Sequence, residues 1–199
     1  PFSKAKVEYF WNSIAKCNLY DIQIGAHPSF YDREHFGRIN IAPTINDLYT
    51  QLIHQLGGFA SIANNLGVKV NHVKAHGALY NEAMVNIEVA QCLLDASLFI
   101  FPRSAIVAMP DSILEMLCNE RNVPLLREGF GDRKYKSKAQ LLSRNLQGAV
   151  LMDPSAVKQA ITNFEDNLVD TLDDGLVPIF IDTVCLHGDN PAINQILLS

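Results

Sequence analysis

The segment that decides the fold is VKVNHVKAHGALY, residues 68–80. Its first six residues alternate β-branched and polar side chains, a pattern typical of a β-strand. Its last seven residues place a lysine, a histidine and a tyrosine directly behind that strand. β/α barrels build their sites from polar side chains at the C-terminal ends of their strands. The segment therefore predicts a strand of a parallel sheet that delivers site residues at its end.

The same arrangement recurs along the chain, because short aliphatic runs alternate with segments whose apolar residues have helical spacing. Helices are predicted over residues 44–66, with Gly67 behind the last turn, over 113–118 and from Asp153-Pro154 to 164. The further predicted strands are residues 22–25, 98–101, 125–127, 149–152 and 179–186.

Alternating strands and helices imply parallel strands joined by right-handed crossovers. Neither G-x-G-x-x-G nor G-x-x-x-x-G-K-[ST] occurs, so an open nucleotide-binding sheet is disfavoured. We expect one α/β domain over residues 1–199, built as a β/α barrel.

Composition excludes several classes of protein. The 199 residues are 48% hydrophobic and carry a net charge of −5, from 16 basic and 21 acidic side chains. This balance argues against disorder and against nucleic-acid binding. No apolar run reaches the roughly 20 residues of a membrane helix, and no signal peptide opens the chain. Four cysteines without a C-x-x-C pair indicate reduced thiols, so we expect a cytoplasmic protein.

Three histidines follow predicted strands and are the first candidates for chemistry. They are His27, His76 and His187, with Lys74 and Asp189 beside two of them. Histidine with nearby carboxylates suits acid–base hydrolysis, and it also suits a metal-assisted hydrolase. No tight metal-ligand pair such as H-E-x-x-H occurs, so both chemistries stay open and the metal content is unknown.

Two further segments supply charged candidates. The loop 30–43 is long enough for a binding loop and carries Arg38, which could hold a carboxylate or phosphate. The segment 127–135 carries Glu128 and Asp132, which could act as acid–base partners or hold cationic groups, and it also carries Arg133. The basic stretch behind it, which includes Arg144, is either a solvated loop or a patch for an anion or a partner.

Five motifs, taken together and in order, resemble the LamB/YcsF family. They are IGAHPS (24–29), FGR (36–38), HVKAHGALY (72–80), REGFGDRKY (127–135) and CLHGD (185–189). Ala75 departs from the proline that the family usually has there. The family also opens with N-A-D-x-G-E and G-F-H-A-G-D-like motifs, which residues 1–199 lack. We therefore expect this sequence to be N-terminally incomplete.

The resemblance implies a seven-stranded β/α barrel of the glycoside hydrolase and deacetylase type. Its first two strands would be missing here. The remaining five would begin near residues 22, 70, 98, 125 and 181, and 149–152 would be an accessory segment.

The resemblance also implies the activity of the 5-oxoprolinase A subunit, in which 5-oxo-L-proline, ATP and water give L-glutamate, ADP and phosphate. ATP would be a co-substrate of a complex with B and C subunits. His76 would act as acid–base catalyst and Lys74 would stabilise the oxyanion. His27, His187 and Asp189 would position water or substrate, and Arg38 or Arg133 would hold the carboxylate or phosphate. The other expected substrate-binding residues are Glu128, Asp132 and Tyr80.

Two alternatives remain at this stage. One is a metal-dependent deacetylase-type hydrolase that acts alone on an N-acyl or carbohydrate substrate. The other is a non-catalytic subunit that docks partners through loop 30–43 and the basic stretch 133–144.

Overall fold

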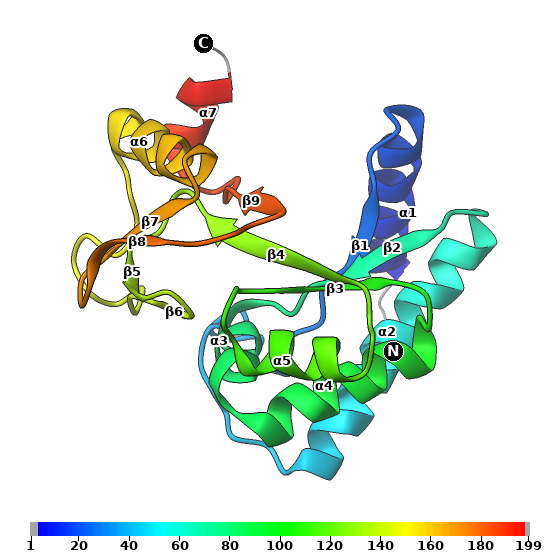
Figure 1. The fold of residues 1–199 in the computed structure, drawn as a ribbon. Coiled ribbons are helices and arrows are strands. Elements are labelled where there is room, and N and C mark those ends of the chain that lie inside the picture. Colours follow the sequence, from blue (N-terminus) through cyan, green and yellow to red (C-terminus); the bar gives the residue numbers. More distant parts are fainter. Residues whose placement is uncertain (1–3, 198–199) are drawn as a thin grey trace.

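The computed structural model describes residues 4–197 and shows an α/β fold around a parallel sheet (Figure 1). Within those residues the sheet has five strands, in the spatial order β1-β2-β3-β4-β9, and every pair is parallel. The strands are β1 Ile24–Ala26, β2 Val70–Val73, β3 Ala105–Ala108, β4 Leu125–Phe130 and β9 Thr183–Cys185. The sheet curls into a half-barrel, which confirms the predicted fold class.

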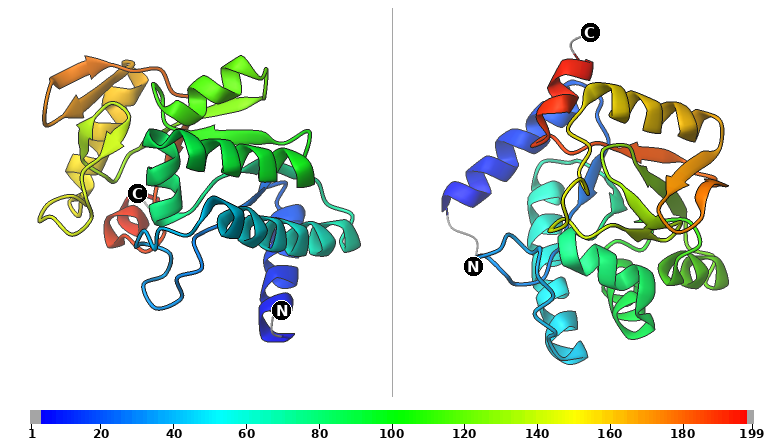
Figure 2. Two further views of the ribbon diagram at one scale, coloured as in Figure 1. Left: turned by 90° about the horizontal axis from the view of Figure 1, so that it is seen from below. Right: turned by 90° about the vertical axis from the view of Figure 1, so that its left-hand side faces the viewer.

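Helices before and between the strands cover the half-barrel from outside. They are α1 Lys4–Leu19, α2 Ile45–Asn65, α3 Gly77–Val85, α4 Ile87–Ile100 and α5 Ile113–Glu120. Figure 2 shows α2 and α4 lying side by side beneath the sheet. Helices α2, α3 and α4 contribute much of the core, where Leu52, Leu79 and Leu94 are fully buried.

Helix α2 confirms the predicted helix over residues 44–66, and its two ends explain why. The side chain of Thr44 caps the first turn by accepting from the Asp47 backbone amide. Gly67 follows the last turn with φ of +67°, the left-handed geometry that favours glycine. The predicted buried stripe faces inward through Leu48, Leu52 and Leu56.

A second, four-stranded sheet lies between β4 and β9 in the chain, and the sequence patterns did not predict it. It contains β5 Tyr135–Ser137, β6 Gln140–Leu141, β7 Leu168–Thr171 and β8 Gly175–Pro178. Helix α6, Pro154–Glu165, packs against it with an Asp153 cap as predicted, and α7, Pro191–Leu197, packs on α6. Strands of two to four residues are too short for a periodicity signal.

Three predicted strands need correction. Residues 98–101 end helix α4, and the sheet strand is Ala105–Ala108 instead. Asn86 caps α4 and the run from Ile87 is apolar throughout, so a short apolar window there cannot distinguish helix from strand. Residues 149–152 form only one bridge, between Val150 and Arg133. Of residues 179–186, only Thr183–Cys185 are strand.

Among residues 4–197, no single helix is long and apolar enough to cross a membrane. Helices α3 and α4 pass that test only as a pair, and they are bent by 117° at their junction.

Candidate active site

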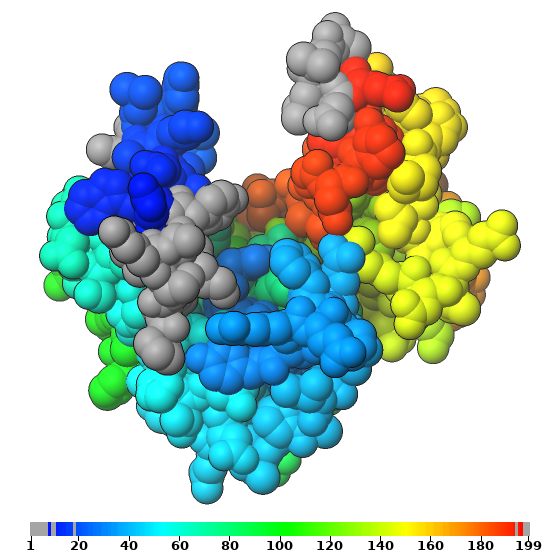
Figure 3. Space-filling view, turned by 180° about the vertical axis from the view of Figure 1, so that it is seen from behind, coloured from blue at the N-terminus to red at the C-terminus, as the bar shows by residue number. Residues whose placement is uncertain are grey.

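The predicted site residues meet at one edge of the half-barrel, where the parallel strands end. His27 follows β1, Lys74 and His76 follow β2, and His187 follows β9. Figure 3 shows a hollow between the α1 arm and the α6–α7 arm, with loop 30–43 at its lower rim. The side chains form an inner cluster around Lys74 and an outer group of histidines and arginines.

Lys74 lies at the centre of the inner cluster. Its Nζ donates to Glu128 Oε1 at 2.5 Å and contacts Cys185 Sγ at 3.1 Å. The rings of Phe130 and Tyr80 face the ammonium at 5.1 and 5.9 Å. Burial alone would lower the pKa of Lys74, but the Glu128 carboxylate outweighs it and raises that pKa. Lys74 therefore remains a buried cation, as stabilisation of an oxyanion requires.

Two oxygen atoms beside this ammonium lack a well-formed hydrogen bond. Glu128 Oε2 and the Tyr80 hydroxyl are buried and have no partner within the described part of the chain. The hydroxyl is nevertheless close enough to favour the charged form of Glu128, whereas burial raises the pKa of that carboxyl. The two oxygens therefore interact with each other beside the Lys74 ammonium, without an ideal hydrogen-bond geometry.

Asp132 orients His187. The carboxylate accepts from His187 Nδ1 at 2.8 Å and from the His187 backbone amide at 3.1 Å, and Asn190 Nδ2 lies 3.3 Å away. Burial opposes ionisation of Asp132, but the hydrogen bonds from His187 outweigh it and lower the pKa of this carboxyl. The contact assigns the proton of the neutral ring to Nδ1, which leaves Nε2 as a free base.

His27 and His76 form a pair, and their three hydrogen-bond contacts need more N–H protons than two neutral rings carry. His27 Nδ1 lies 2.7 Å from the Lys74 carbonyl oxygen, and His76 Nε2 lies 2.9 Å from that of Phe36. His27 Nε2 and His76 Nδ1 are 3.0 Å apart. Three hydrogen bonds need three N–H protons, and two neutral rings carry two. All three contacts are satisfied only when the pair holds one extra proton.

The surroundings oppose that extra proton. Burial, together with the positive charge of His76, lowers the pKa of His27 to about 4. Burial also lowers the pKa of His76, with the charges of Arg38, His187 and Arg144 acting in the same direction. The pair is therefore neutral near pH 7. The contact between the two rings then lacks a proton, and the pair can accept one there.

Loop 30–43 is fastened to the end of β2 at two glycines. The Ala78 amide donates to the Gly37 carbonyl oxygen at 2.9 Å. Gly77 has φ of +57°, and a Cβ there would lie 2.5 Å from that oxygen. Any side chain at Gly77 would push the loop away. The two glycines therefore hold the Phe36 carbonyl over His76.

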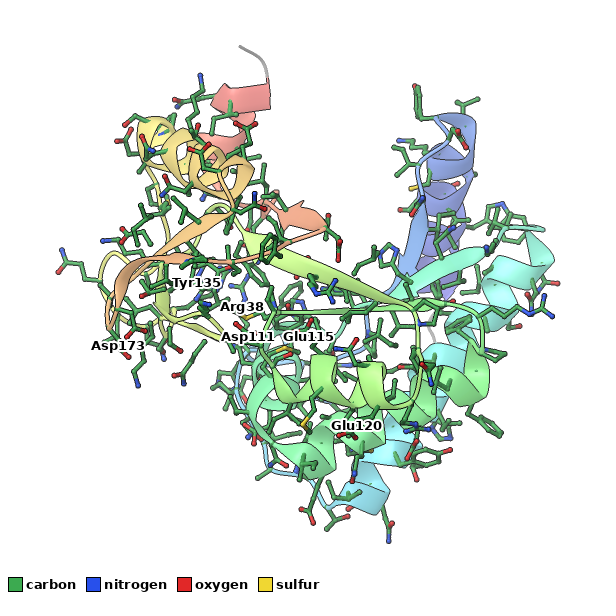
Figure 4. All side chains as sticks on the ribbon, in the orientation of Figure 1. Arg38, Asp111, Glu115, Glu120, Tyr135 and Asp173 are labelled. Atoms are coloured by element: carbon green, nitrogen blue, oxygen red, sulfur yellow. The ribbon has the colours of Figure 1, made fainter. Side chains whose placement is uncertain are left out.

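Arg38 and Asp189, predicted for separate roles, bind each other. Arg38 Nη2 donates to Asp189 Oδ2 at 3.1 Å, and both side chains are exposed. This hydrogen bond, more than any other influence, lowers the pKa of Asp189. In the view of Figure 4, the label of Arg38 lies between those of Tyr135 and Glu115.

Arg133, the other arginine predicted to contact substrate, is buried instead among backbone carbonyls. Its guanidinium donates to Leu142 O at 2.6 Å and to Ala149 O at 3.3 Å. Burial lowers the pKa of Arg133 to about 10. This side chain therefore supports the loop 142–149.

Two further residues of the site, Cys185 and His72, were not among the residues predicted from the sequence. Cys185 is one of four free cysteines and touches the Lys74 ammonium. The His72 ring fills the space that a Cβ at Gly25 would occupy, so the glycine of the IGAHPS motif makes room for it. Neither contact has a local sequence signal, because the partners are far apart in the chain. Within residues 4–197, no group of three histidine, cysteine or acidic side chains is arranged to hold a metal ion.

The chain is similar to known proteins over nearly its whole length. The LamB/YcsF family profile matches residues 6–198. The 5-oxoprolinase A subunit of Carboxydothermus hydrogenoformans is 39% identical over 86% of this chain and 67% of its own length. The corresponding A subunit of Chloroflexus aggregans is 35% identical over 90% of this chain and 72% of its own.

A solved structure has the same fold. The lactam utilization protein from Thermus thermophilus superposes with a TM-score of 0.84 at 26% identity, covering 95% of this chain and 77% of that one. The family match spans nearly all of the chain and includes every site residue described above. The chain therefore belongs to the LamB/YcsF family.

Proposed function

We propose that this chain is the A subunit of a 5-oxoprolinase, which opens the ring of 5-oxo-L-proline to give L-glutamate. The observation that carries the proposal is the identity of 35–39% to proteins named as 5-oxoprolinase A subunits, over most of the chain. The arrangement of a buried cation next to two histidine bases supports it, because hydrolysis of an amide needs both an oxyanion stabiliser and a proton carrier.

The substrate explains why ATP takes part. A five-membered lactam is an unstrained amide, and its hydrolysis is slow. Phosphorylation of the carbonyl oxygen turns that oxygen into a leaving group. Within the proposed complex, the B and C subunits use ATP to make the activated lactam. This chain then receives it at the end of the half-barrel.

Different residues of the site perform different parts of the ring-opening step. Water attacks the activated carbonyl carbon and loses a proton to His76, while His187, oriented by Asp132, positions that water. The Lys74 ammonium faces the negative charge that develops on oxygen. The ring C–N bond of the tetrahedral intermediate then breaks and leaves an acyl phosphate, which a second water hydrolyses to the carboxylate and free phosphate. The released nitrogen takes up the proton that His76 holds.

The test measures glutamate released from 5-oxo-L-proline and ATP, with and without the B and C subunits. We expect release only in the complete mixture, and about a 10²- to 10⁴-fold slower rate with His76→Ala. His54→Ala, which changes an exposed histidine on α2, is the matched control and should leave the rate unchanged. Full activity of a folded, assembled His76→Ala complex would refute the assignment of His76. No release with three folded subunits would refute the proposed function.

A further inference from the structure

The loop 142–149 is held in place at both ends. Beyond the two hydrogen bonds from Arg133, the Lys134 amide donates to Ala149 O at 3.0 Å, and the Leu142 amide donates to Lys134 O at 2.9 Å. A turn inside the loop adds a bond from Leu146 N to Ser143 O at 3.0 Å. A loop fixed in this way presents its side chains in a defined position. The residue inside the turn is Arg144.

Arg144 lies close enough to the active site for its charge to act on His76 at the end of β2, on Asp189 behind β9 and on Arg133. The side chain is partly buried, and it forms no ion pair with any carboxylate that the structure describes. Segment 30–43 borders this part of the chain in the view of Figure 3. Arg144 is thus a cation held next to the catalytic histidine without a partner of opposite charge.

Positive charges outnumber negative charges around Arg38 and Arg144. Arg38 and Arg144 supply two permanent positive charges, and Asp189 supplies one negative charge, which Arg38 already engages. A guanidinium group is built to bind a carboxylate or phosphate through two parallel hydrogen bonds. The surplus charge and the unengaged donors of Arg144 both favour binding of an anion.

We propose that Arg144 and Arg38 form a subsite that binds the anionic group of the ligand beside the His27–His76 pair. Arg144 takes the role that the sequence alone assigned to Arg133. Naming the anion as the carboxylate of 5-oxo-L-proline rests on the proposed function, whereas the subsite itself rests on the loop and its charges. A phosphate group has the same recognition chemistry, and the test separates the two.

The experiment compares ligands with and without a negative charge. Calorimetric titration of the full chain measures binding of 5-oxo-L-proline, of uncharged 2-pyrrolidinone and of inorganic phosphate. Arg144→Ala should weaken binding of 5-oxo-L-proline about 10- to 100-fold and leave binding of 2-pyrrolidinone unchanged, because it removes a charge-assisted hydrogen bond. Arg144→Lys should restore part of the affinity. Lys136→Ala removes an exposed charge from β5 and is the control that should change neither affinity.

The outcomes separate the subsite from the proposed function. Arg144-dependent binding of phosphate, with no binding of 5-oxo-L-proline, would support the anion subsite and count against the proposed substrate. An Arg144→Ala protein that binds both anions as tightly as the wild type would overturn the subsite. Equal weakening of charged and uncharged ligands would overturn it as well.

Discussion

The ion pair of Lys74 and Glu128 makes the sharpest prediction about stability. The two atoms are 2.5 Å apart, and only 5% of the Glu128 side chain is exposed. Lys74→Met keeps most of the packing and leaves the carboxylate buried without its partner. Removing one partner of a buried pair costs about 3–5 kcal/mol of unfolding free energy. We expect a loss of that size at pH 7, measured by urea denaturation followed by circular dichroism.

A surface pair provides the control. Arg121 and Asp95 are 2.6 Å apart, but 42% and 52% of their side chains are exposed. Arg121→Met should therefore cost no more than about 1 kcal/mol. The double variant Lys74→Met with Glu128→Gln removes both charges and should recover much of the loss.

The loss of stability in Lys74→Met should depend on pH, in a direction that the pKa of Glu128 determines. Without the ammonium, burial holds the folded pKa of Glu128 above its unfolded value of about 4.3. The folded state then binds the proton more tightly than the unfolded state. The deficit of Lys74→Met should be full above the folded pKa and disappear as the pH falls below about 4. A loss no larger than that of Arg121→Met, or one that does not vary with pH, would refute the reasoning.

Two other changes test the outer part of the site. Asp132→Asn should slow turnover about 10²- to 10⁴-fold by releasing His187, as measured in the glutamate assay with the assembled complex. Because the folded pKa of Asp132 is lowered, its ionised form stabilises the protein above about pH 4. The stability difference between wild type and Asp132→Asn should therefore shrink as the pH falls below that value, and a difference that is constant from pH 7 to pH 3 would contradict this. Gly77→Ala and Gly67→Ala share a left-handed backbone, but only Gly77 faces a carbonyl oxygen, that of Gly37. Gly67→Ala should cost about 1–2 kcal/mol and Gly77→Ala clearly more, and equal melting temperatures for the two variants would contradict the proposed loop contact.

The sequence predicts an element of secondary structure correctly where the interactions that form it lie within one segment. The helix over residues 44–66 is predictable because its cap, its apolar stripe and its terminal glycine all lie within one segment. The strand predicted at residues 98–101 is wrong for the opposite reason. An aliphatic run suits a buried helix as well as a buried strand, and the cap at Asn86 together with packing of α4 on α2 decides for the helix.

The amino-acid sequence by itself determined the alternation of strands and helices, and it placed His27, Lys74, His76 and His187 at strand ends. Parallel strands bring those ends to one edge, so a shared site followed directly. Only the tertiary structure decided which side chains bind each other. The partners in these pairs are 54, 55 and 151 residues apart: Lys74 with Glu128, Asp132 with His187, and Arg38 with Asp189. The curl of the sheet and the path of its loops set those distances, and they depend on packing across the whole fold, which no local pattern of residues contains.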